Sequence, residues 1–179
     1  MNIVEAAPEH AAALTRFFAD LPAGDLTFIK EDVTDPATVR SWTEAGSGRW
    51  LSFDEGTVTG YVAVHRLAGW SDHVGEIRLV VHPAHRGTGL GRALARQALT
   101  QGVASRLTKV VVELVADQEH ALAMFTALGF TGEALLRNHL RDRDGTLRDL
   151  VMLAHYVDDT WSGMGTVGLI DELGLDHEL

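Results

Sequence analysis

The order of the expected elements predicts an α+β fold built on a mixed sheet. The chain reads as a strand, two helices, three strands, a helix, a strand, a helix and two strands. The run at 109–115 is almost continuously apolar, which is typical of a central strand buried on both faces. An apolar strand at 75–82 runs into a glycine-rich turn and then into an alanine-rich helix. We find no internal repeat and no low-complexity segment.

Length and composition describe an ordinary globular protein. At 179 residues, with 46% hydrophobic and 22% charged residues, the chain is large enough for one good core. The absence of cysteine excludes disulfides and a thiolate nucleophile and disfavours zinc, so we expect no metal site. We find no apolar run that could span a bilayer and no secretion signal, so we expect a cytoplasmic protein with no membrane partner.

The charge is unevenly spread along the chain. The net charge is −10, and six of the 25 acidic residues follow Val157, where there is no Lys or Arg. An acidic protein is a poor match for nucleic acid, so we expect no nucleic-acid partner. We divide the chain into one domain at 1–157 and an acidic, glycine-rich tail at 158–179. The tail is either a disordered end or an interaction arm, and its apolar residues could form one short helix.

The first part of the chain predicts one strand and two helices. Residues 2–6 form the strand, Pro8 suits the first turn of a helix, and 22–24 end that helix. Asp35 is expected to cap a second helix that ends at Gly46. Their buried faces are marked by Leu14, Phe17, Phe18, Leu21, Val39 and Trp42. This region either forms one wall of a site or only covers one face of the sheet.

The middle of the chain predicts a hairpin and then a strand and a helix. Strands at 49–53 and 58–66 flank an Asp-Glu-Gly turn, which is a hairpin pattern. After a loop at 68–72 comes the apolar strand 75–82. Apolar residues then repeat at helical spacing from Leu90 onward.

The last part of the chain predicts a strand, a helix and a final hairpin. The strand 109–115 is followed by a helix at 118–128, and Gly129 suits the left-handed position that ends a helix. Strands at 133–141 and 147–156 flank an Asp-Arg-Asp-Gly turn, which is also typical of a hairpin.

The turn between the strand 75–82 and the next helix is expected to bind an anion. Gly87, Gly89 and Gly91 let the backbone bend sharply and approach a ligand closely. The first N–H groups of a helix have no partner within it, and the helix dipole favours negative charge there. Arg86 and Arg92 add positive charge beside the turn. These features predict a phosphate site at a strand-to-helix junction.

Two common nucleotide-binding motifs fit this turn less well. A dinucleotide fingerprint requires Gly-x-Gly-x-x-Gly, and the spacing from Gly87 to Gly91 differs from it. A P-loop requires Gly-Lys-Ser/Thr, whereas Gly91 is followed by Arg92 and Ala93. A nucleotide-binding protein is therefore only a third interpretation.

With its flanking strand, this turn resembles the acetyl-CoA signature of the GCN5-related N-acetyltransferase (GNAT) family. That signature is a strand, then Arg/Gln-x-x-Gly-x-Gly/Ala, then a helix, and here it reads from Arg86 to Gly91. Residues 118–130, which end in Gly129 and Phe130, resemble a second landmark of the family. The resemblance covers most of 2–156 in element order and is specific in sequence from 76 to 130.

The resemblance implies the acyl-CoA N-acyltransferase fold, a mixed and mostly antiparallel sheet with splayed fourth and fifth strands, flanked by helices. It implies acetyl-CoA as co-substrate, with the turn on the CoA pyrophosphate and the pantetheine arm beside the fourth strand. The cofactor-binding residues implied are Leu79, Val80, Val81, Arg86, Gly87, Thr88, Gly89, Leu90, Gly91, Arg92, Gln118 and Phe125.

Transfer of an acetyl group to an amine requires a general base, because an ammonium group has no lone pair. Glu76, at the start of the fourth strand, and Glu113, a lone charge in an apolar strand, are the candidates, and relatives place the base near one or the other. Either carboxylate could instead be solvated or ion-paired. His65, His73 and His120 are further candidate bases.

Two residues depart from the family pattern. Phe125 stands where the family often has a tyrosine that protonates the CoA thiolate, and Gln118 stands where an asparagine is usual. Tyr61 and Tyr156 are the only tyrosines, and neither matches that position. The departure at Phe125 favours an alternative, an acyl-CoA-binding sensor or interaction module with little or no catalysis.

We expect an N-acetyltransferase that moves the acetyl group directly from acetyl-CoA to an amine of a small molecule or of a peptide or protein. Direct transfer follows from the absence of a cysteine, or an evident serine, to carry the acyl group. The acceptor is expected to bind between the region 20–48 and the terminal hairpin, against the splayed strands. The sequence leaves both a monomer and a homodimer open.

Overall fold

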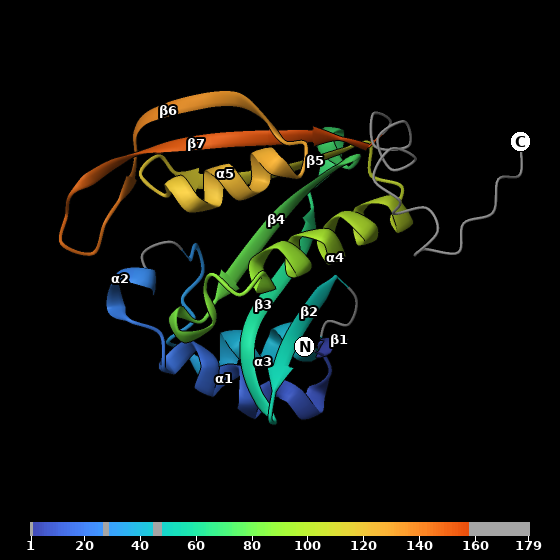
Figure 1. Cartoon of the computed structure of the whole chain (residues 1–179), viewed down its shortest axis with the longest axis vertical. Helices are drawn as coiled ribbons and strands as arrows, with labels where there is room; N and C mark the ends of the chain where they lie inside the picture. The colour runs from blue at the N-terminus through green and yellow to red at the C-terminus, as the bar shows by residue number, and fades with distance from the viewer. Residues whose placement is uncertain (1, 27–28, 45–47, 158–179) are drawn as a thin grey trace, which may run out of the picture.

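A computed structural model describes residues 2–26, 29–44 and 48–157, which form one seven-stranded sheet flanked by helices (Figure 1). The strand order is β1-β2-β3-β4-β5-β7-β6. All neighbours are antiparallel except β4 and β5, which are parallel. The predicted mixed, mostly antiparallel sheet is thus confirmed. The strands are β1 (Asn2–Glu5), β2 (Arg49–Asp54), β3 (Thr57–Arg66), β4 (Val74–Val81), β5 (Lys109–Val115), β6 (Thr131–Arg141) and β7 (Leu147–Tyr156).

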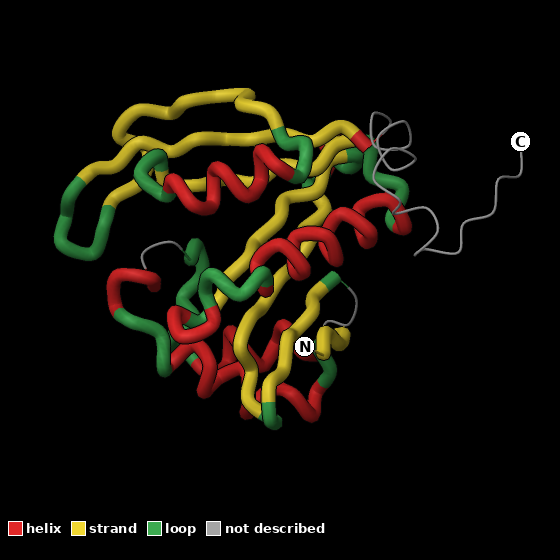
Figure 2. The backbone as a smooth tube through the Cα atoms, in the orientation of Figure 1, coloured by secondary structure: helices red, strands yellow, loops and turns green. Residues whose placement is uncertain are grey.

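Helices cover both faces of the sheet (Figure 2). One face carries α1 and α3, and the other carries α4 and α5. The α-helices are α1 (Ala11–Ala19), α2 (Ala23–Leu26), α3 (Pro36–Glu44), α4 (Leu90–Ala104) and α5 (Glu119–Ala127), and the short 3-10 helices are η1 (Pro8–His10), η2 (Gly69–Ser71) and η3 (Pro83–His85). No helix in these described ranges is both long and apolar enough to cross a membrane.

β4 and β5 pair over only half of the length of β4. Their register runs from Val74 opposite Lys109 to Ile77 opposite Val112. Beyond Ile77, β4 continues beside β3, while β5 continues beside β7. The two strands therefore diverge in the middle of the sheet, as Figure 1 shows, which confirms the expected splay. The diverging part of β4 has one edge without a strand partner among the described residues.

The alternation of side chains along these strands determines which groups reach each face. Ile77 on β4 and Val112 on β5 are buried in the core under α4 and α5. Because successive side chains of a strand point to opposite faces, Glu76, Arg78 and Glu113 point to the face that carries α1 and α3. Three charged groups are thereby brought to one place on the sheet.

Local turn chemistry explains several element ends. Asp35 Oδ1 accepts a hydrogen bond from Ala37 N at 2.9 Å, which confirms the expected cap of α3. Gly129 has a φ of 86°, as expected for the residue that ends α5. Glu55 and Gly56 both have positive φ, as a tight two-residue hairpin turn between β2 and β3 requires.

Some boundaries differ from the sequence interpretation, and others lie outside the described residues. The first helix ends at Ala19, and residues Ala23–Leu26 form a further helical turn, so Gly24 lies inside a helix where a stop was expected. β6 begins at Thr131, two residues earlier than expected. The expected helix end at Gly46 and the tail 158–179 lie outside the described residues. The division of the chain after residue 157 stays a prediction.

Candidate active site

The turn before α4 is built to present backbone N–H groups. Gly87 and Gly89 have φ values of 75° and 88°, a region that side-chain-bearing residues rarely adopt. Among the described residues, the N–H groups of Gly87, Thr88 and Gly89 donate no hydrogen bond to the protein. Gly91 instead allows close packing of α4 on α5. A Cβ at Gly91 would lie 3.2 Å from Met124 Sδ, so the Met124 side chain would have to shift. The turn therefore combines donors for an anion with the positive end of a 15-residue helix.

The two arginines of the turn differ in their surroundings. Arg86 Nη2 lies 2.8 Å from Asp25 Oδ2 of α2, and Arg86 Nε donates to Val81 O at 3.2 Å. Arg92 lies on the first turn of α4 and carries no ion pair among the described residues. The sequence interpretation did not include Asp25, which lies 61 positions from its partner. The ion pair connects α2 to the turn and aims the Arg86 guanidinium along the end of β4.

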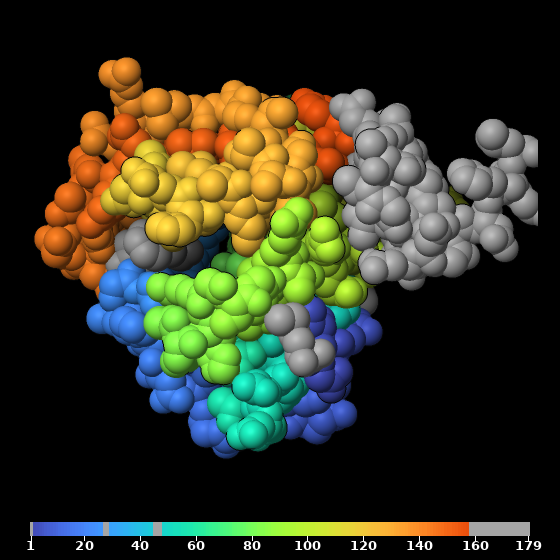
Figure 3. Space-filling view, viewed as in Figure 1, coloured from blue at the N-terminus to red at the C-terminus, as the bar shows by residue number. Residues whose placement is uncertain are grey.

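A groove of about 880 Å³ runs from this turn along the diverging part of β4 to α5. The space-filling view shows the surface hollowed between α5 and the segment that leads into α4 (Figure 3). The groove thus connects the anion-binding turn to the edge of β4. Its lining comprises Asp25, Ile29, Leu79, Val80, Val81, Arg86, Gly87, Gly89, Gly91, Arg92, Asp117, Gln118, Glu119, His120, Ala121 and Met124.

Three of the residues predicted to bind the cofactor do not line the groove. Thr88 donates its hydroxyl to His85 O at 2.7 Å and so stabilises the turn. Leu90 is buried in the core. Phe125 is also buried, and its ring lies edge-on to that of Phe130, with centroids 5.1 Å apart. Leu90 can offer a ligand only its backbone groups, Thr88 keeps its backbone groups and the acceptor capacity of its hydroxyl, and Phe125 has no proton to donate.

Gln118 lines the groove but also has a structural role. Its Oε1 accepts a hydrogen bond from Val115 N at 3.1 Å, where β5 leads into α5. The amide side chain therefore fixes the start of α5 at the wall of the groove. The neighbouring His120 lines the groove as well, on the first turn of the same helix.

A smaller cavity of about 130 Å³ adjoins the groove where β4 and β5 diverge. The two share lining residues, including Leu79, Gln118 and Met124. Charged side chains line it from three places in the chain: Lys30 and Glu31 after α2, Glu76 and Arg78 on β4, and Glu113 on β5. Lys30 and Glu31 thus form part of one wall of the cavity, which is one of the two roles that the sequence left open for this region. The hairpin of β6 and β7, all of it described, provides no lining residue.

Lys30 joins the two predicted base candidates. Its Nζ lies 2.6 Å from Glu76 Oε1 and 2.7 Å from Glu113 Oε2. The Glu76 and Glu113 side chains are only 10% and 20% exposed, respectively, whereas that of Lys30 is 44% exposed. The Glu76 carboxylate is therefore buried and that of Glu113 is partly buried in the cavity wall, and the ammonium group reaches them from the solvent side.

Burial lowers the pKa of Lys30, but hydrogen bonds to Glu113 and Glu76 and the charges of these carboxylates raise it more. The net effect is a pKa above the ordinary value, so the amine is held as an ammonium ion. Two carboxylates thus stabilise one primary ammonium group at this point of the cavity wall.

Arg78 fixes one of the carboxylates. Its Nε lies 3.3 Å from Glu76 Oε1, and its guanidinium also pairs with Glu31. Burial lowers the pKa of Arg78, and the Glu113 charge opposes that effect. Glu76 is thus held by two cations, whereas the one ion pair of Glu113 within the described residues is that with Lys30.

The other titratable candidates occupy different places. His65 lies opposite Glu76 in the register of β3 and β4, and its side chain is half-buried. Burial lowers the pKa of His65, and the charges of Arg49 and Lys30 lower it further. His73 lies just before β4, away from both cavities. Tyr61 is buried in the smaller cavity against Trp42, with stacked rings 5.4 Å apart. Burial raises the pKa of Tyr61 to about 12, although Arg49 opposes it.

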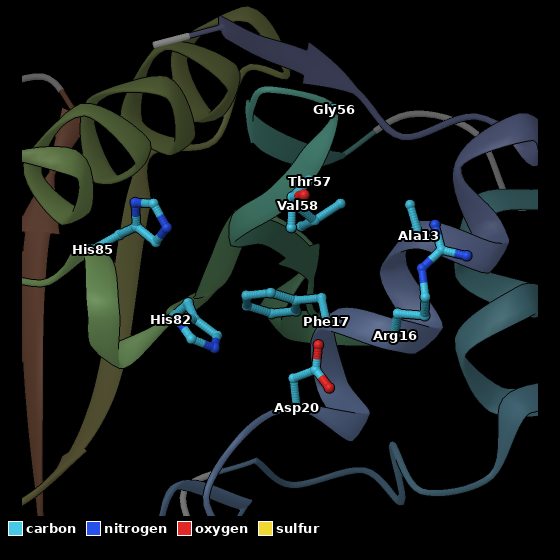
Figure 4. Close-up of a pocket in the computed structure, with 9 residues that line it drawn as sticks. All are labelled: Ala13, Arg16, Phe17, Asp20, Gly56, Thr57, Val58, His82 and His85. Carbon is cyan, nitrogen blue, oxygen red and sulfur yellow. The ribbon is translucent and has the colours of Figure 1, made fainter.

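A separate pocket of about 370 Å³ lies between α1, the β2–β3 turn and η3 (Figure 4). His82 and His85 face Phe17 and Val58 across it, with Arg16 and Asp20 at its side. None of the predicted site residues lines this pocket. We assign it no role.

Comparison with known proteins agrees with this geometry. The model of the acetyltransferase (GNAT) family matches residues 15–130, which include β4, the turn, α4, β5 and α5. The chain belongs to this family. The matched residues include the whole lining of the groove and both Glu76 and Glu113.

Two curated relatives of this GNAT chain are acetyltransferases. Mycothiol acetyltransferase of Amycolatopsis mediterranei is 36% identical over 100 residues, which cover 51% of this chain and 32% of the relative. N-alpha-acetyltransferase RimI of Mycobacterium tuberculosis is 33% identical over 116 residues, which cover 64% of this chain and 72% of the relative. The chain spans about a third of the length of the mycothiol acetyltransferases it matches.

A solved structure shares the fold of this GNAT chain. A phosphinothricin acetyltransferase from Sinorhizobium meliloti, in complex with acetyl-CoA, superposes with a TM-score of 0.72 at 16% identity and covers 87% of each chain. At this level of identity the likeness shows the fold, including the flanked mixed sheet.

Proposed function

We propose that the protein transfers an acetyl group from acetyl-CoA directly to an amine. The observation that carries the proposal is the continuity of three features. The glycine turn, the unpaired edge of β4 and the Glu76–Glu113 pair line one groove and the cavity that adjoins it. The acetyltransferase names of the relatives support the same reaction class.

In this proposal the turn binds the pyrophosphate of acetyl-CoA. The N–H groups of Gly87, Thr88 and Gly89, the α4 dipole and the Arg86 and Arg92 side chains supply the positive potential. The pantetheine arm extends along Leu79, Val80 and Val81, whose backbone can pair with it as a strand partner would. This arrangement directs the thioester toward the adjoining cavity and requires no metal.

Glu113 acts as the general base and Glu76 as an anchor. An acceptor ammonium that replaces Lys30 between the two carboxylates loses a proton to Glu113, and the neutral amine attacks the thioester carbonyl. N–H groups on the open edge of β4 can stabilise the oxyanion. The carbon–sulfur bond then breaks, the nitrogen loses its second proton to solvent as the amide forms, and solvent protonates the thiolate. In this proposal water protonates the CoA thiolate, because Phe125 stands at the position of the family's tyrosine and has no proton to donate.

The acceptor class follows from the charge of the cavity. Glu31, Glu76 and Glu113 outnumber Lys30 and Arg78, so the wall favours an acceptor that arrives as a cation. Both a small molecule and a peptide or protein that carries a primary amine satisfy this requirement. One relative is named mycothiol acetyltransferase and another N-alpha-acetyltransferase RimI, and these names do not decide between the two classes.

The test combines acetyl-CoA calorimetry with thiol release across a panel of primary, secondary and aromatic amines. We expect acetyl-CoA to bind and primary amines to release thiol. Tight binding of acetyl-CoA without thiol release from any amine would reject the enzyme hypothesis and favour an acyl-CoA-binding module. Binding of ATP or NAD in place of CoA would reject the cofactor assignment.

A further inference from the structure

Lys30 occupies the place that the proposed reaction gives to the acceptor amine. Its Nζ is a primary amine within 2.6 Å and 2.7 Å of the two carboxylates assigned to hold and deprotonate the acceptor. Its side chain lines the cavity that adjoins the cofactor groove. The lysine is 44% exposed and lies between α2 and α3, on a segment outside regular secondary structure. An acceptor and the base that serves it are thus present within one chain.

We propose that Lys30 is a self-acetylation site, an internal acceptor that takes an acetyl group from acetyl-CoA bound to the same molecule. This inference rests on the proposed function, because it uses the same cofactor groove and the same base. Its substrates are acetyl-CoA and the Lys30 side chain, and its product is an Nε-acetyl-lysine in the cavity wall.

The chemistry of the step balances without a further reactant. Glu113 accepts one proton from the Lys30 ammonium, and the neutral Nζ forms a bond to the thioester carbonyl carbon. The carbon–sulfur bond breaks, the electron pair leaves with sulfur, and CoA takes a proton to become the free thiol. The nitrogen loses its second proton to solvent as the amide forms, and Glu113 afterwards releases its own proton to solvent, so that one of the two protons is matched by that of the CoA thiol and the other is set free. Proximity favours this step, because the nucleophile is already held in the cavity.

The surroundings of Lys30 make the step depend on pH. The groups around the cavity and its neighbouring strands are Glu31 after α2, Arg49 on β2, Tyr61 and His65 on β3, Glu76 and Arg78 on β4, and Glu113 on β5. Burial lowers the pKa of Lys30, but the two carboxylates raise it above its ordinary value overall. The neutral amine is therefore a minor form near neutrality, and the rate of self-acetylation should rise with pH.

Acetylation would change the site itself. The amide of acetyl-lysine carries no charge, so the ion pairs from Lys30 to Glu76 and Glu113 would be lost. Both carboxylates would then be available to an external ammonium. The modified protein should consequently bind a cationic acceptor with less competition from its own lysine.

The sequence offers a matched internal control. The chain has two lysines, Lys30 and Lys109. Lys109 also pairs with a carboxylate, that of Glu133, but it lies on β5 away from both cavities. Indiscriminate chemical acetylation would label both lysines, whereas the proposed step would label only Lys30.

The experiment incubates the full chain with acetyl-CoA and no acceptor and follows each lysine by intact mass and peptide mapping. Lys30 should gain one acetyl group at least about tenfold faster than Lys109. Its first-order rate constant should not depend on protein concentration, should rise with pH, and should fall at least about tenfold in Glu113→Gln. Lys30→Arg should abolish the label, and Lys109→Arg should preserve both the label and turnover of external amines.

Three outcomes would overturn the inference. Equal labelling of the two lysines would mean chemical acetylation alone. A first-order rate constant that rises in proportion to protein concentration would mean transfer between molecules. An unlabelled Lys30 in a protein that acetylates external amines would reject self-acetylation and leave the proposed function standing, whereas loss of both activities would reject the proposed function as well.

Discussion

At the scale of single residues, Glu76 and Glu113 differ in their surroundings. Glu76 is held by Lys30 and Arg78, whereas Glu113 pairs with Lys30. We assign proton transfer to Glu113 because an acceptor amine that replaces Lys30 leaves its carboxylate without another ion-pair partner among the described residues, whereas Arg78 continues to hold Glu76.

Glu113→Gln keeps the size of the side chain and removes its basicity. We expect kcat for an external amine to fall by about 10²–10⁴-fold, the usual contribution of a general base, with the Kd for acetyl-CoA unchanged. Stopped-time thiol release and calorimetry would measure the two quantities. A variant that retains activity within a few-fold of wild type would exclude Glu113 as the base.

His65 gives a pH-dependent prediction. Burial, with the Arg49 and Lys30 charges, lowers the pKa of His65 below its ordinary value of 6.5. At a pH between the pKa of folded His65 and 6.5, the unfolded chain binds a proton at His65 that the folded chain does not. The contribution of His65 to stability is therefore fully present above pH 6.5 and is lost as the pH falls from 6.5 through the folded pKa.

Urea unfolding of wild type and His65→Gln, measured on both sides of that window, would test this sign. The free energy of unfolding should fall more steeply with acidification in the wild type than in the variant. Identical slopes would show that His65 takes up its proton equally well in the folded and unfolded states.

Some residues of the site follow from sequence patterns and others do not. Arg78 stands two positions after Glu76, and the alternation of a strand puts both on one face, so that partnership could have been predicted. Lys30 lies 46 positions from Glu76 in a segment without periodicity. A local pattern carries no information about such a contact. The one sequence feature that marks Lys30 is that the chain has only one other lysine.

At the scale of elements, the strand-to-helix turn is the best-determined part of the account. Gly89→Glu would place a carboxylate at the proposed phosphate position, where, apart from Gly89 and its two chain neighbours, no atom of the described residues lies within 4 Å of the place that a Cβ would take. We expect loss of measurable CoA binding, because the new charge repels the pyrophosphate and the side chain fills its space.

The matched control for this turn is Gly145→Glu. Gly145 has a φ of 91°, close to the 88° of Gly89, and also has open space around it, but it lies in the β6–β7 hairpin. Both variants should lose about 1–2 kcal/mol of stability from the left-handed backbone. Calorimetry should find CoA affinity lost only at Gly89. CoA affinity within a few-fold of wild type in Gly89→Glu would contradict the phosphate assignment.

Element order was predictable because it depends on short-range patterns. The apolar run of β5, the Asp35 cap and the Gly129 helix end are each local and each correct. The splay of β4 from β5 came from the family resemblance, since no local pattern states where two strands stop pairing. The helical turn α2 was missed because Pro22 and Gly24 suggested a stop. Its Asp25 is tied to Arg86 by an ion pair that spans 61 positions.

At the scale of the whole molecule, both the groove and the adjoining cavity are formed within residues 18–125. Deleting 158–179 should therefore leave the Kd for acetyl-CoA unchanged and keep primary-amine turnover. Calorimetry and thiol release on the chain ending at Val157 would measure both. A large loss of binding would show that the acidic tail contributes to the cofactor site.

The central claim is that acetyl-CoA binds in the groove with its acetyl group facing the Glu76–Glu113 pair. A crystal structure grown with acetyl-CoA tests it most directly. We expect density for the pyrophosphate on the turn from Arg86 to Arg92, for the pantetheine along Leu79 to Val81, and for the acetyl group beside Lys30. Density for the cofactor in any other place, or an acetyl group remote from both carboxylates, would contradict the account.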